Sequence, residues 1–271
     1  MNKRATATAP PRAAPPIPAD TGSASDAPQR LPVVDLLRGL AIAQMVAYHF
    51  IYDLTYFGWL HFEMTEIAGW VAWRNAIVTQ FLLVCGVGVG LGEAAGRTGA
   101  RFWRRWLQIA GAAALVSIAS AWLFGPRWIW FGMLHFVAVA LLIARPLASV
   151  GGIKGGAVNL AVGAAVLVLG WTVHDERFDS QWIGWIGMAA DRPPTEDYVP
   201  LVPWFGVVAI GIGLTAFWTR RGFATPPALR ELDSPPARAL RWLGRWPLTI
   251  YLVHQPIMMA VLMGVRHLAG D

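Results

Sequence analysis

Long apolar stretches recur along the chain from about residue 33 onward, separated by short polar segments. Seven of them offer the roughly 20 mostly apolar residues that a helix needs to cross a bilayer. They lie at 33–55, 67–92, 104–124, 128–147, 157–173, 200–219 and 245–266. Backbone groups in lipid must be satisfied within the segment, and the stretches are too long for barrel strands. The pattern therefore predicts an all-α, polytopic membrane bundle of about seven helices over residues 32–271.

Residues 1–31 have a different character, with eight alanines, six prolines and no long apolar run. Such a segment cannot bury enough surface to offset the entropy lost on ordering. We expect it to be a disordered tail.

Composition agrees with a membrane protein. The residue types AVILMFWYC make up 56% of the 271 residues and charged residues only 14%, against about 25% charged in soluble domains. Cys85 is the only cysteine, so an intrachain disulfide is excluded.

The basic residues are unevenly distributed among the connecting segments. Sixteen of the 22 Lys and Arg fall in one alternating set of segments, and four fall in the other set. The basic set is 1–32, 93–105, 145–156 and 220–245; the other is 51–66, 125–127, 174–199 and 265–271. By the positive-inside rule, the N-terminus is cytoplasmic and the C-terminus is outside. The pI of about 10.1 thus reflects topology, and nucleic acid is not an expected partner.

A few ionisable residues lie within the predicted spans, where they are costly and often functional. His49, His135 and His254 come from three different spans, and helix rise places them at compatible depths. Asp53 follows His49 by one helical turn and could orient its imidazole. A lone histidine in a span is often only a hydrogen-bonding group between helices, but three at one depth favour a shared polar site.

Asp35 and Arg38 share a helix face at the predicted inner end of the first span. They could form a structural ion pair, with Arg38 reaching toward the headgroups. Alternatively, Arg38 could bind an anion arriving from the cytoplasm, such as a nucleotide phosphate. Arg74 is the other arginine within a span. No spacing typical of a metal site appears among the cysteine and histidines, so we expect no metal.

Tryptophan is abundant, and ten of the fifteen fall near the predicted outer face. The simplest interpretation is an aromatic belt that anchors helix ends. The excess outside also suits stacking on sugars, with the loop 178–190 as the favoured place. Tyr52, Trp130 and Gln255 are the residues we expect to bind an acceptor.

Four sequence blocks in order resemble a known family. They read D35-L-L-R38-G-L-A-I with M45-V-A-Y-H49-F-I-Y52-D53-L; W130-F-G-M-L-H135-F; D197-Y-V-P-L-V-P-W-F-G206; and L243-G-R-W-P-L-T-I-Y-L-V-H254-Q255-P. Over about residues 31–264 the chain resembles the bacterial branch of the heparan-alpha-glucosaminide N-acetyltransferase catalytic family. That family is in turn similar, more distantly, to membrane acyltransferases that modify surface glycans.

The resemblance implies transfer of an acetyl or other acyl group from cytoplasmic acyl-CoA to an amine or hydroxyl of an extracytoplasmic or lipid-linked glycan. It implies a multi-pass protein of a bacterial inner membrane, with acetyl-CoA or another acyl-CoA as cosubstrate and Arg38 toward its side. In the glycan acyltransferases the histidine matching His49 is held to be catalytic. The lysosomal enzyme has asparagine there and a histidine displaced by one residue from His61, so His61 is a reserve candidate.

Two other function classes stay open at this stage. A transporter or flippase could use the same buried polar groups as a pathway, although no inverted repeat is visible. A haem protein could use histidines from separate helices, although no helix carries a repeated pair. The sequence leaves a homo-oligomer open and does not identify the acceptor.

Overall fold

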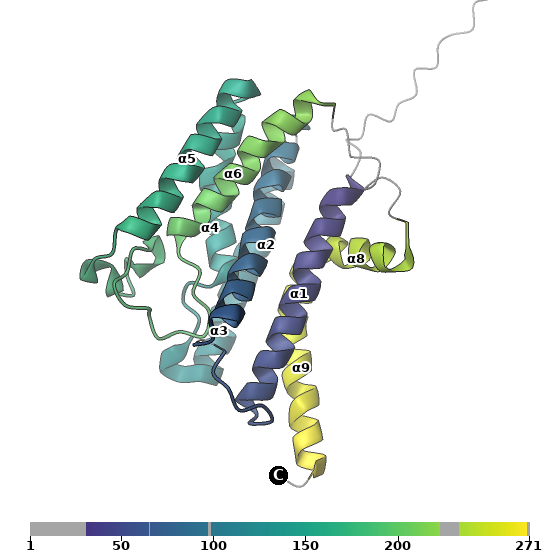
Figure 1. Ribbon diagram of the computed structural model, residues 1–271, viewed down its shortest axis with the longest axis vertical. Coiled ribbons are helices and arrows are strands. Elements are labelled where there is room, and N and C mark those ends of the chain that lie inside the picture. The colour runs from purple at the N-terminus through teal and green to yellow at the C-terminus, as the bar shows by residue number, and fades with distance from the viewer. Residues whose placement is uncertain (1–30, 65, 97–98, 223–232, 270–271) are drawn as a thin grey trace, which may run out of the picture. The chain divides into compact units, whose positions relative to one another are not determined.

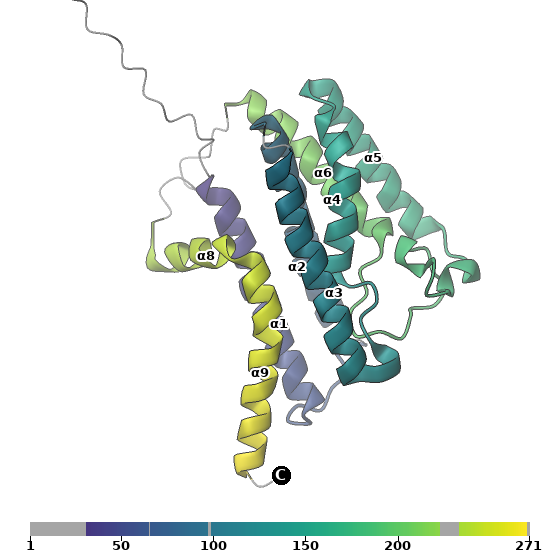
Figure 2. The same cartoon turned by 180° about the vertical axis from the view of Figure 1, so that it is seen from behind.

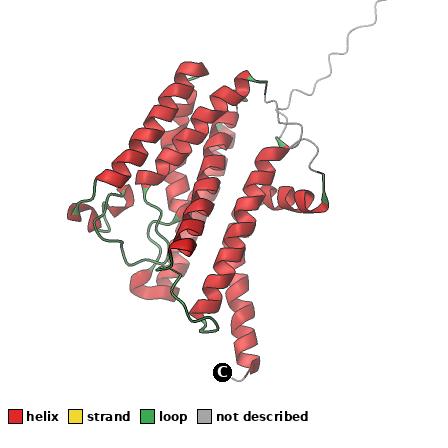
Figure 3. Cartoon of the chain, viewed as in Figure 1, coloured by secondary structure: helices red, strands yellow, loops and turns green. Residues whose placement is uncertain are grey.

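The computed structural model describes residues 31–64, 66–96, 99–222 and 233–269. The predicted tail at 1–31 lies outside the described residues, except for Leu31. Within the described residues the fold is helical, as Figure 3 shows, with two isolated β-bridges, Phe131 to Tyr198 and Gly187 to Val202. The prediction of an all-α protein is confirmed.

Eight α-helices occur in the described part of the chain. In order they are α1 (Pro32–Tyr56), α2 (Ala68–Ala94), α3 (Ala100–Phe124), α4 (Met133–Ser149), α5 (Gly152–Thr172), α6 (Leu201–Arg220), α8 (Pro235–Arg245) and α9 (Pro247–Ala269). Three short 3₁₀ helices lie in the loops: η1 (Gly125–Arg127), η2 (Glu176–Asp179) and η3 (Gly184–Ile186).

Six of these helices are long and apolar enough to cross a membrane: α1, α2, α3, α5, α6 and α9. The remaining predicted span, at 128–147, is shorter than expected. Its helix α4 begins only at Met133 and has 17 residues. The segment before it, from Trp128 to Gly132, is not helical. The protein is thus a multi-pass membrane protein whose fourth apolar helix is short.

The helix ends fall on two sides (Figure 1). We call the side where α1 begins and where α2 and α6 end the basic side, because the arginine-rich segments connect there. We call the opposite side, where α1 ends and where α2 and α6 begin, the acidic side. In the topology predicted above, the basic side faces the cytoplasm.

Helix α6 is the centre of the main core. It packs against α2, α4 and α5, and Val208 on α6 is almost fully buried, as are Leu82 on α2 and Phe136 on α4. At the crossing with α2, Gly86 faces Gly211 so closely that a side-chain carbon at either position would collide with the opposite backbone. Small residues commonly permit such contacts between membrane helices.

Helices α1 and α9 pack along each other, as Figures 1 and 2 show from opposite sides. Tyr251 and Leu252 of α9 also pack on a cluster formed by α3 and α4, around Ala113 and Leu134. Helix α9 therefore contacts both α1 and the cluster of α3 and α4, while α1 also packs directly on α2. This position places its polar residues between helices.

Helix α8 lies across α1 near the basic side and was not predicted from the sequence (Figure 1). Ser234 caps its N-terminus by accepting a hydrogen bond from the Ala237 amide at 3.4 Å, and Pro235 occupies the first turn. Gly244 meets Gly39 of α1 with no room for a side chain at either position. The segment 220–245, predicted as a loop, thus contains a helix packed on α1.

Candidate functional site

Two histidines face each other across the interface of α1 and α9. The ring centroids of His49 and His254 are 5.1 Å apart, at an interplanar angle of 61°. The prediction from helix rise that both reach one depth is confirmed by this contact. His254 is buried and His49 is half-buried.

An acid and an amide make a second link between the same two helices, one turn further along α1. Gln255 Nε2 donates a hydrogen bond to Asp53 Oδ1 at 2.6 Å. Asp53 Oδ2 and Gln255 Oε1 are buried, and neither has a hydrogen-bond partner among the described residues. Among the described residues no hydrogen bond joins Asp53 to His49, so the expected orienting role of Asp53 stays a prediction.

The hydrogen bonds of His254 define its tautomer. Nδ1 lies 2.8 Å from the carbonyl oxygen of Tyr251 and 3.1 Å from that of Ile250. Since a carbonyl only accepts, Nδ1 carries the hydrogen, and in the neutral ring Nε2 keeps a free lone pair. Nε2 is buried without a partner in the described residues. A buried base with an open lone pair can accept a proton from a bound substrate.

His135 is held differently. Its Nδ1 accepts from the Gly132 amide at 3.3 Å, and its Nε2 lies 2.8 Å from Ser117 Oγ. Because Ser117 donates its hydrogen to the Ile129 carbonyl at 2.8 Å, it accepts from Nε2. Both ring nitrogens are therefore occupied. In the described structure a ring contact joins His49 to His254 but none joins His135 to either of them, so a site shared by all three stays a prediction.

Asp197 links the start of α4, which carries His135, to Tyr251 beside His254. Its Oδ2 accepts from the Met133 amide at 2.8 Å and from the Tyr251 hydroxyl at 3.3 Å. The Tyr251 ring lies 5.9 Å from the ring of His254. Burial raises the pKa of Asp197 above its ordinary value, while the Met133 amide and the Tyr251 hydroxyl oppose that rise. The sequence analysis did not predict Asp197 as a site residue, although Asp197 belongs to one of the four sequence blocks.

The loop that carries Asp197 is fixed to the segment before α4. Thr195 Oγ1 donates to the Trp128 carbonyl at 2.8 Å, and the Val199 amide donates to the Phe131 carbonyl at 3.3 Å. Tyr198 donates to the Gly184 carbonyl at 2.6 Å. Burial raises the pKa of Tyr198 to about 12. The loop 178–190, where sugar stacking was predicted, contains 3₁₀ turns.

Two residues predicted to bind the acceptor lie around this loop. The Tyr52 hydroxyl is 3.5 Å from Glu196 Oε2, so Tyr52 connects α1 to the loop near Asp197. The ring of Trp130 lies 5.8 Å from that of Tyr198 in the same loop. His61, the reserve candidate, is exposed in the loop between α1 and α2, and no ring contact ties it to the histidine pair within the described residues.

Arg38 and Asp35 lie near the basic side. Arg38 Nη1 donates to Asp35 Oδ1 at 3.0 Å and to the Gly244 carbonyl at 3.2 Å, so the pair also fixes α8 to α1. The other guanidinium nitrogen reaches toward Gly88 of α2. Arg105 of α3 acts electrostatically on Arg38 from a third helix. Asp35 offsets one of these two positive charges, and the net positive charge that is left can hold phosphate groups.

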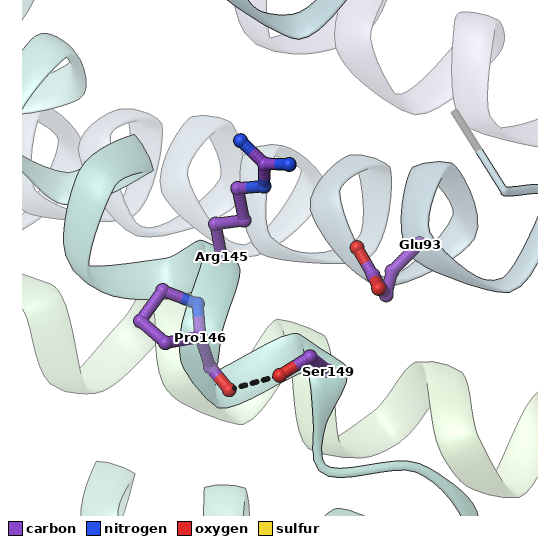
Figure 4. Close-up of a pocket in the computed structure, with 4 residues that line it drawn as sticks. All are labelled: Glu93, Arg145, Pro146 and Ser149. Carbon is purple, nitrogen blue, oxygen red and sulfur yellow. Dashed lines mark hydrogen bonds between the residues drawn. The ribbon is translucent and has the colours of Figure 1, made fainter. Parts of the chain in front are cut away.

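A shallow open pocket lies elsewhere on the basic side. Glu93 of α2 lines it with Arg145, Pro146 and Ser149 of α4, and Ser149 donates to the Pro146 carbonyl at 2.7 Å (Figure 4). It contains none of the predicted site residues. Among the described residues, no three His, Cys, Asp or Glu side chains are grouped to hold a metal ion.

Comparison with known proteins agrees with the resemblance seen in the sequence blocks. Residues 30–256 match the family model described as heparan-alpha-glucosaminide N-acetyltransferase, catalytic. No curated protein and no solved structure matches the chain. The matched range covers most of the chain and ends directly after Gln255, so it includes both helices that carry the histidine pair. The protein therefore belongs to the heparan-alpha-glucosaminide N-acetyltransferase catalytic-domain family, whose activity is acetyl transfer from acetyl-CoA.

Proposed function

We propose that this protein transfers an acetyl group from cytoplasmic acetyl-CoA to an amine or hydroxyl of an extracytoplasmic or lipid-linked sugar. We further propose that it is a bacterial inner-membrane enzyme of the family's bacterial branch. The observation that carries the proposed chemistry is the free, buried Nε2 of His254 beside His49, between two membrane helices.

The reaction needs a base at the acceptor. The acceptor nitrogen or oxygen attacks the thioester carbonyl carbon, a new bond forms to the acetyl group, and the carbon–sulfur bond breaks. His254 Nε2 takes the proton released by the acceptor and returns it to the departing CoA thiolate. His49, which has no hydrogen bond within the described residues, lies beside His254 and is free to contact the acetyl group or the acceptor.

Asp53 and Gln255 support the histidine pair. A carboxylate close to the pair favours the imidazolium that forms when a histidine takes a proton. Gln255 fixes this carboxylate from α9, so that the two helices present acid and base together. Direct transfer and an acyl-histidine intermediate are both compatible with this arrangement.

The donor is proposed to enter from the basic side. Arg38, with Arg105 nearby, would hold CoA phosphates there. From Arg38 to His49 the rise along α1 is ~16 Å, a length that an extended pantetheine arm can span. The acetyl group would then reach the histidine pair while the nucleotide stays at the basic side.

The test is acetyl transfer by purified protein in nanodiscs, with labelled acetyl-CoA and a panel of amino sugars. We expect His254→Ala and His49→Ala each to lower turnover by about 10²- to 10⁴-fold. His174→Ala is the matched control, because His174 is exposed in the loop after α5 and should keep the full rate. A double His49→Ala, His254→Ala variant with the unaltered rate would refute the assignment. Sugar uptake without any acyl donor would instead support a transporter.

A further inference from the structure

The open pocket on the basic side has no part in the proposed reaction. Glu93 of α2 lines it together with Arg145, Pro146 and Ser149 of α4, and its volume is about 260 Å³. Figure 4 shows the carboxylate of Glu93 and the guanidinium of Arg145 on the same side of the end of α4. Sites for drug-sized ligands have volumes of about 300–1,000 Å³. The size of this pocket therefore suits a small polar group.

The two charged residues of the pocket have opposite signs but do not neutralise each other. In the part of the chain that the structure describes, neither Glu93 nor Arg145 forms an ion pair or a hydrogen bond. The guanidinium carbon of Arg145 instead lies 4.7 Å from the centre of the Phe102 ring on α3. A guanidinium held on a ring keeps the N–H groups at its edge free to donate. The pocket thus presents a positioned donor group and a carboxylate to the same space.

The helix ends at the pocket add to the negative charge of Glu93. The C-terminus of an α-helix carries a partial negative charge, which a basic residue in the last turn usually offsets. Neither α2 nor α4 has a basic residue in its last turn, and α2 has Glu93 there. Pro146 also lacks the amide hydrogen that would bond to the Leu142 carbonyl within α4. These acceptors favour a ligand that brings a cation with N–H donors.

The exposed face of α4 continues from the pocket into the apolar part of the helix. Pro146 and Ser149 are exposed, and Leu142, one turn further from the helix end, is 40% exposed. Residues three and four apart lie on one face of a helix, so these three form one strip. In a protein that spans a membrane, an exposed apolar side chain below the helix end contacts lipid. An acyl chain can therefore lie along α4 with its headgroup in the pocket.

We propose that this pocket binds a phospholipid headgroup that carries both a phosphate and a primary ammonium, as phosphatidylethanolamine does. Arg145 would donate to the phosphate. The ammonium would donate to the Glu93 carboxylate and to carbonyls near the end of α4, and an acyl chain would follow Leu142. Pockets between membrane helices on the cytoplasmic side are recurrent binding places for lipid headgroups. The site does not depend on the proposed function, because none of its residues takes part in acetyl transfer.

The test titrates the full-length protein in detergent with lipids that share their acyl chains and differ in the headgroup. Dioctanoyl phosphatidylethanolamine has the phosphate and the primary ammonium. Dioctanoyl phosphatidylglycerol lacks the cation, and dioctanoyl phosphatidylcholine has a quaternary ammonium without N–H groups. Glycerophosphoethanolamine is the same headgroup without acyl chains. Native mass spectrometry measures the fraction of protein that carries each ligand, and thermal unfolding measures the stabilisation that binding produces.

We expect phosphatidylethanolamine to bind about tenfold or more tightly than the other two lipids, as charge-assisted hydrogen bonds predict. Glu93→Gln should remove this preference, and Arg145→Gln should weaken the binding of all three lipids about tenfold. Ser149→Phe keeps both charges but fills the pocket, so it should block binding. Glu66→Gln and Arg221→Gln are the controls, because they make the same charge changes at exposed positions outside the pocket.

Several outcomes would overturn the proposal. One is equal binding of phosphatidylethanolamine and either other lipid by the unaltered protein, and another is a preference that survives Glu93→Gln. If glycerophosphoethanolamine bound as tightly as the lipid, the pocket would not be a lipid site. Thermal unfolding without lipid shows whether each variant is folded. If Arg145→Gln is not folded, because it loses the contact with Phe102, Ser149→Phe decides the outcome, since the only hydrogen bond of its serine is to the Pro146 carbonyl within the described residues.

Discussion

Gln255 on α9 donates a 2.6 Å hydrogen bond to Asp53 on α1, and the remaining oxygen of each side chain is buried without a partner in the described residues. A buried polar atom without a partner normally costs free energy. His254 Nε2 is a third such atom, and all three belong to the interface of α1 and α9. The pair therefore joins the two helices and leaves two acceptor oxygens in this interface that a substrate could satisfy.

The first prediction concerns this pair. Asp53→Asn keeps the shape of the side chain and removes its charge, so the imidazolium formed in the reaction loses its stabilisation. We expect turnover to fall by about 10²-fold or more while the thermal midpoint changes little. Gln255→Leu leaves Asp53 without its donor and should lower stability by ~1 kcal/mol. Steady-state kinetics and thermal unfolding measure the two effects, and an Asp53→Asn variant with normal turnover would contradict the role given to its charge.

The second prediction separates His135 from His254. His135→Phe keeps a ring but leaves the Gly132 amide and Ser117 without their partner, so it should destabilise the protein by about 1–3 kcal/mol. Turnover per folded molecule should stay within about tenfold, whereas His254→Phe should lose more than about 10²-fold. Both variants are compared by unfolding in detergent and by kinetics on the folded fraction. If His135→Phe stayed stable and lost all turnover, His135 would belong to the catalytic group after all.

The third prediction follows from the raised pKa of Asp197. Because its pKa is higher in the folded protein than in the unfolded chain, the folded state binds the proton more tightly. Its stabilising contribution is complete below the unfolded pKa of about 3.9 and is lost as the pH rises through the folded pKa. Asp197→Asn cannot ionise and lacks this dependence.

The measurement for Asp197 is the difference in unfolding free energy between the unaltered protein and Asp197→Asn, from about pH 4 to about pH 8. We expect this difference to move against the unaltered protein as the pH rises. Asp175→Asn is a useful contrast, because Asp175 is exposed and its pKa is lowered by the Arg177 amide. A constant difference for Asp197→Asn would show that its ionisation is not coupled to folding.

The membrane helices were predictable from the sequence because long apolar runs have few alternatives in lipid. Helix α8 was not, because its eleven residues are rich in arginine and form no apolar run, although Ser234 before two prolines is a signal for a helix start. Helix rise predicted compatible depths for His49, His135 and His254, but it does not fix the direction in which a side chain points. It therefore could not show that His49 and His254 meet while no ring contact joins His135 to them among the described residues.

The residues around Asp197 show a second limit of sequence reasoning. Asp197 and Arg192 belong to a loop, and no periodicity tells where a loop folds back. The contact of Asp197 with Tyr251 depends on the hydrogen bonds of Thr195 and Val199 to the segment before α4. Gln255 could be assigned to the site from its place next to His254 in the sequence. That it binds Asp53 could be seen only from the packing of α9 on α1.

The fourth prediction concerns the proposed donor side. Arg38→Gln removes one phosphate-binding group and should raise KM for acetyl-CoA by about tenfold or more, without changing KM for the acceptor. Arg245→Gln is the control, since Arg245 is exposed at the end of α8 and should leave both constants unchanged. Kinetics with each substrate varied in turn measure the effect. An Arg38→Gln variant in which only the acceptor KM rises would place the donor elsewhere.

The last prediction tests whether α8 positions Arg38. Gly39→Ala introduces a carbon that would collide with the backbone of Leu240, so α8 must move away from α1 and the Gly244 carbonyl can no longer hold Arg38. Gly92→Ala is a matched control: this glycine is also helical, nothing lies within 4 Å of an added carbon, and alanine there should stabilise by about 0.5–1 kcal/mol. We expect Gly39→Ala to lower the thermal midpoint and to raise KM for acetyl-CoA in the same direction as Arg38→Gln. The double variant Gly39→Ala, Arg38→Gln should then be no worse in KM than Arg38→Gln alone, because the alanine acts through the arginine. Fully additive effects would mean that α8 acts on donor binding through some other contact.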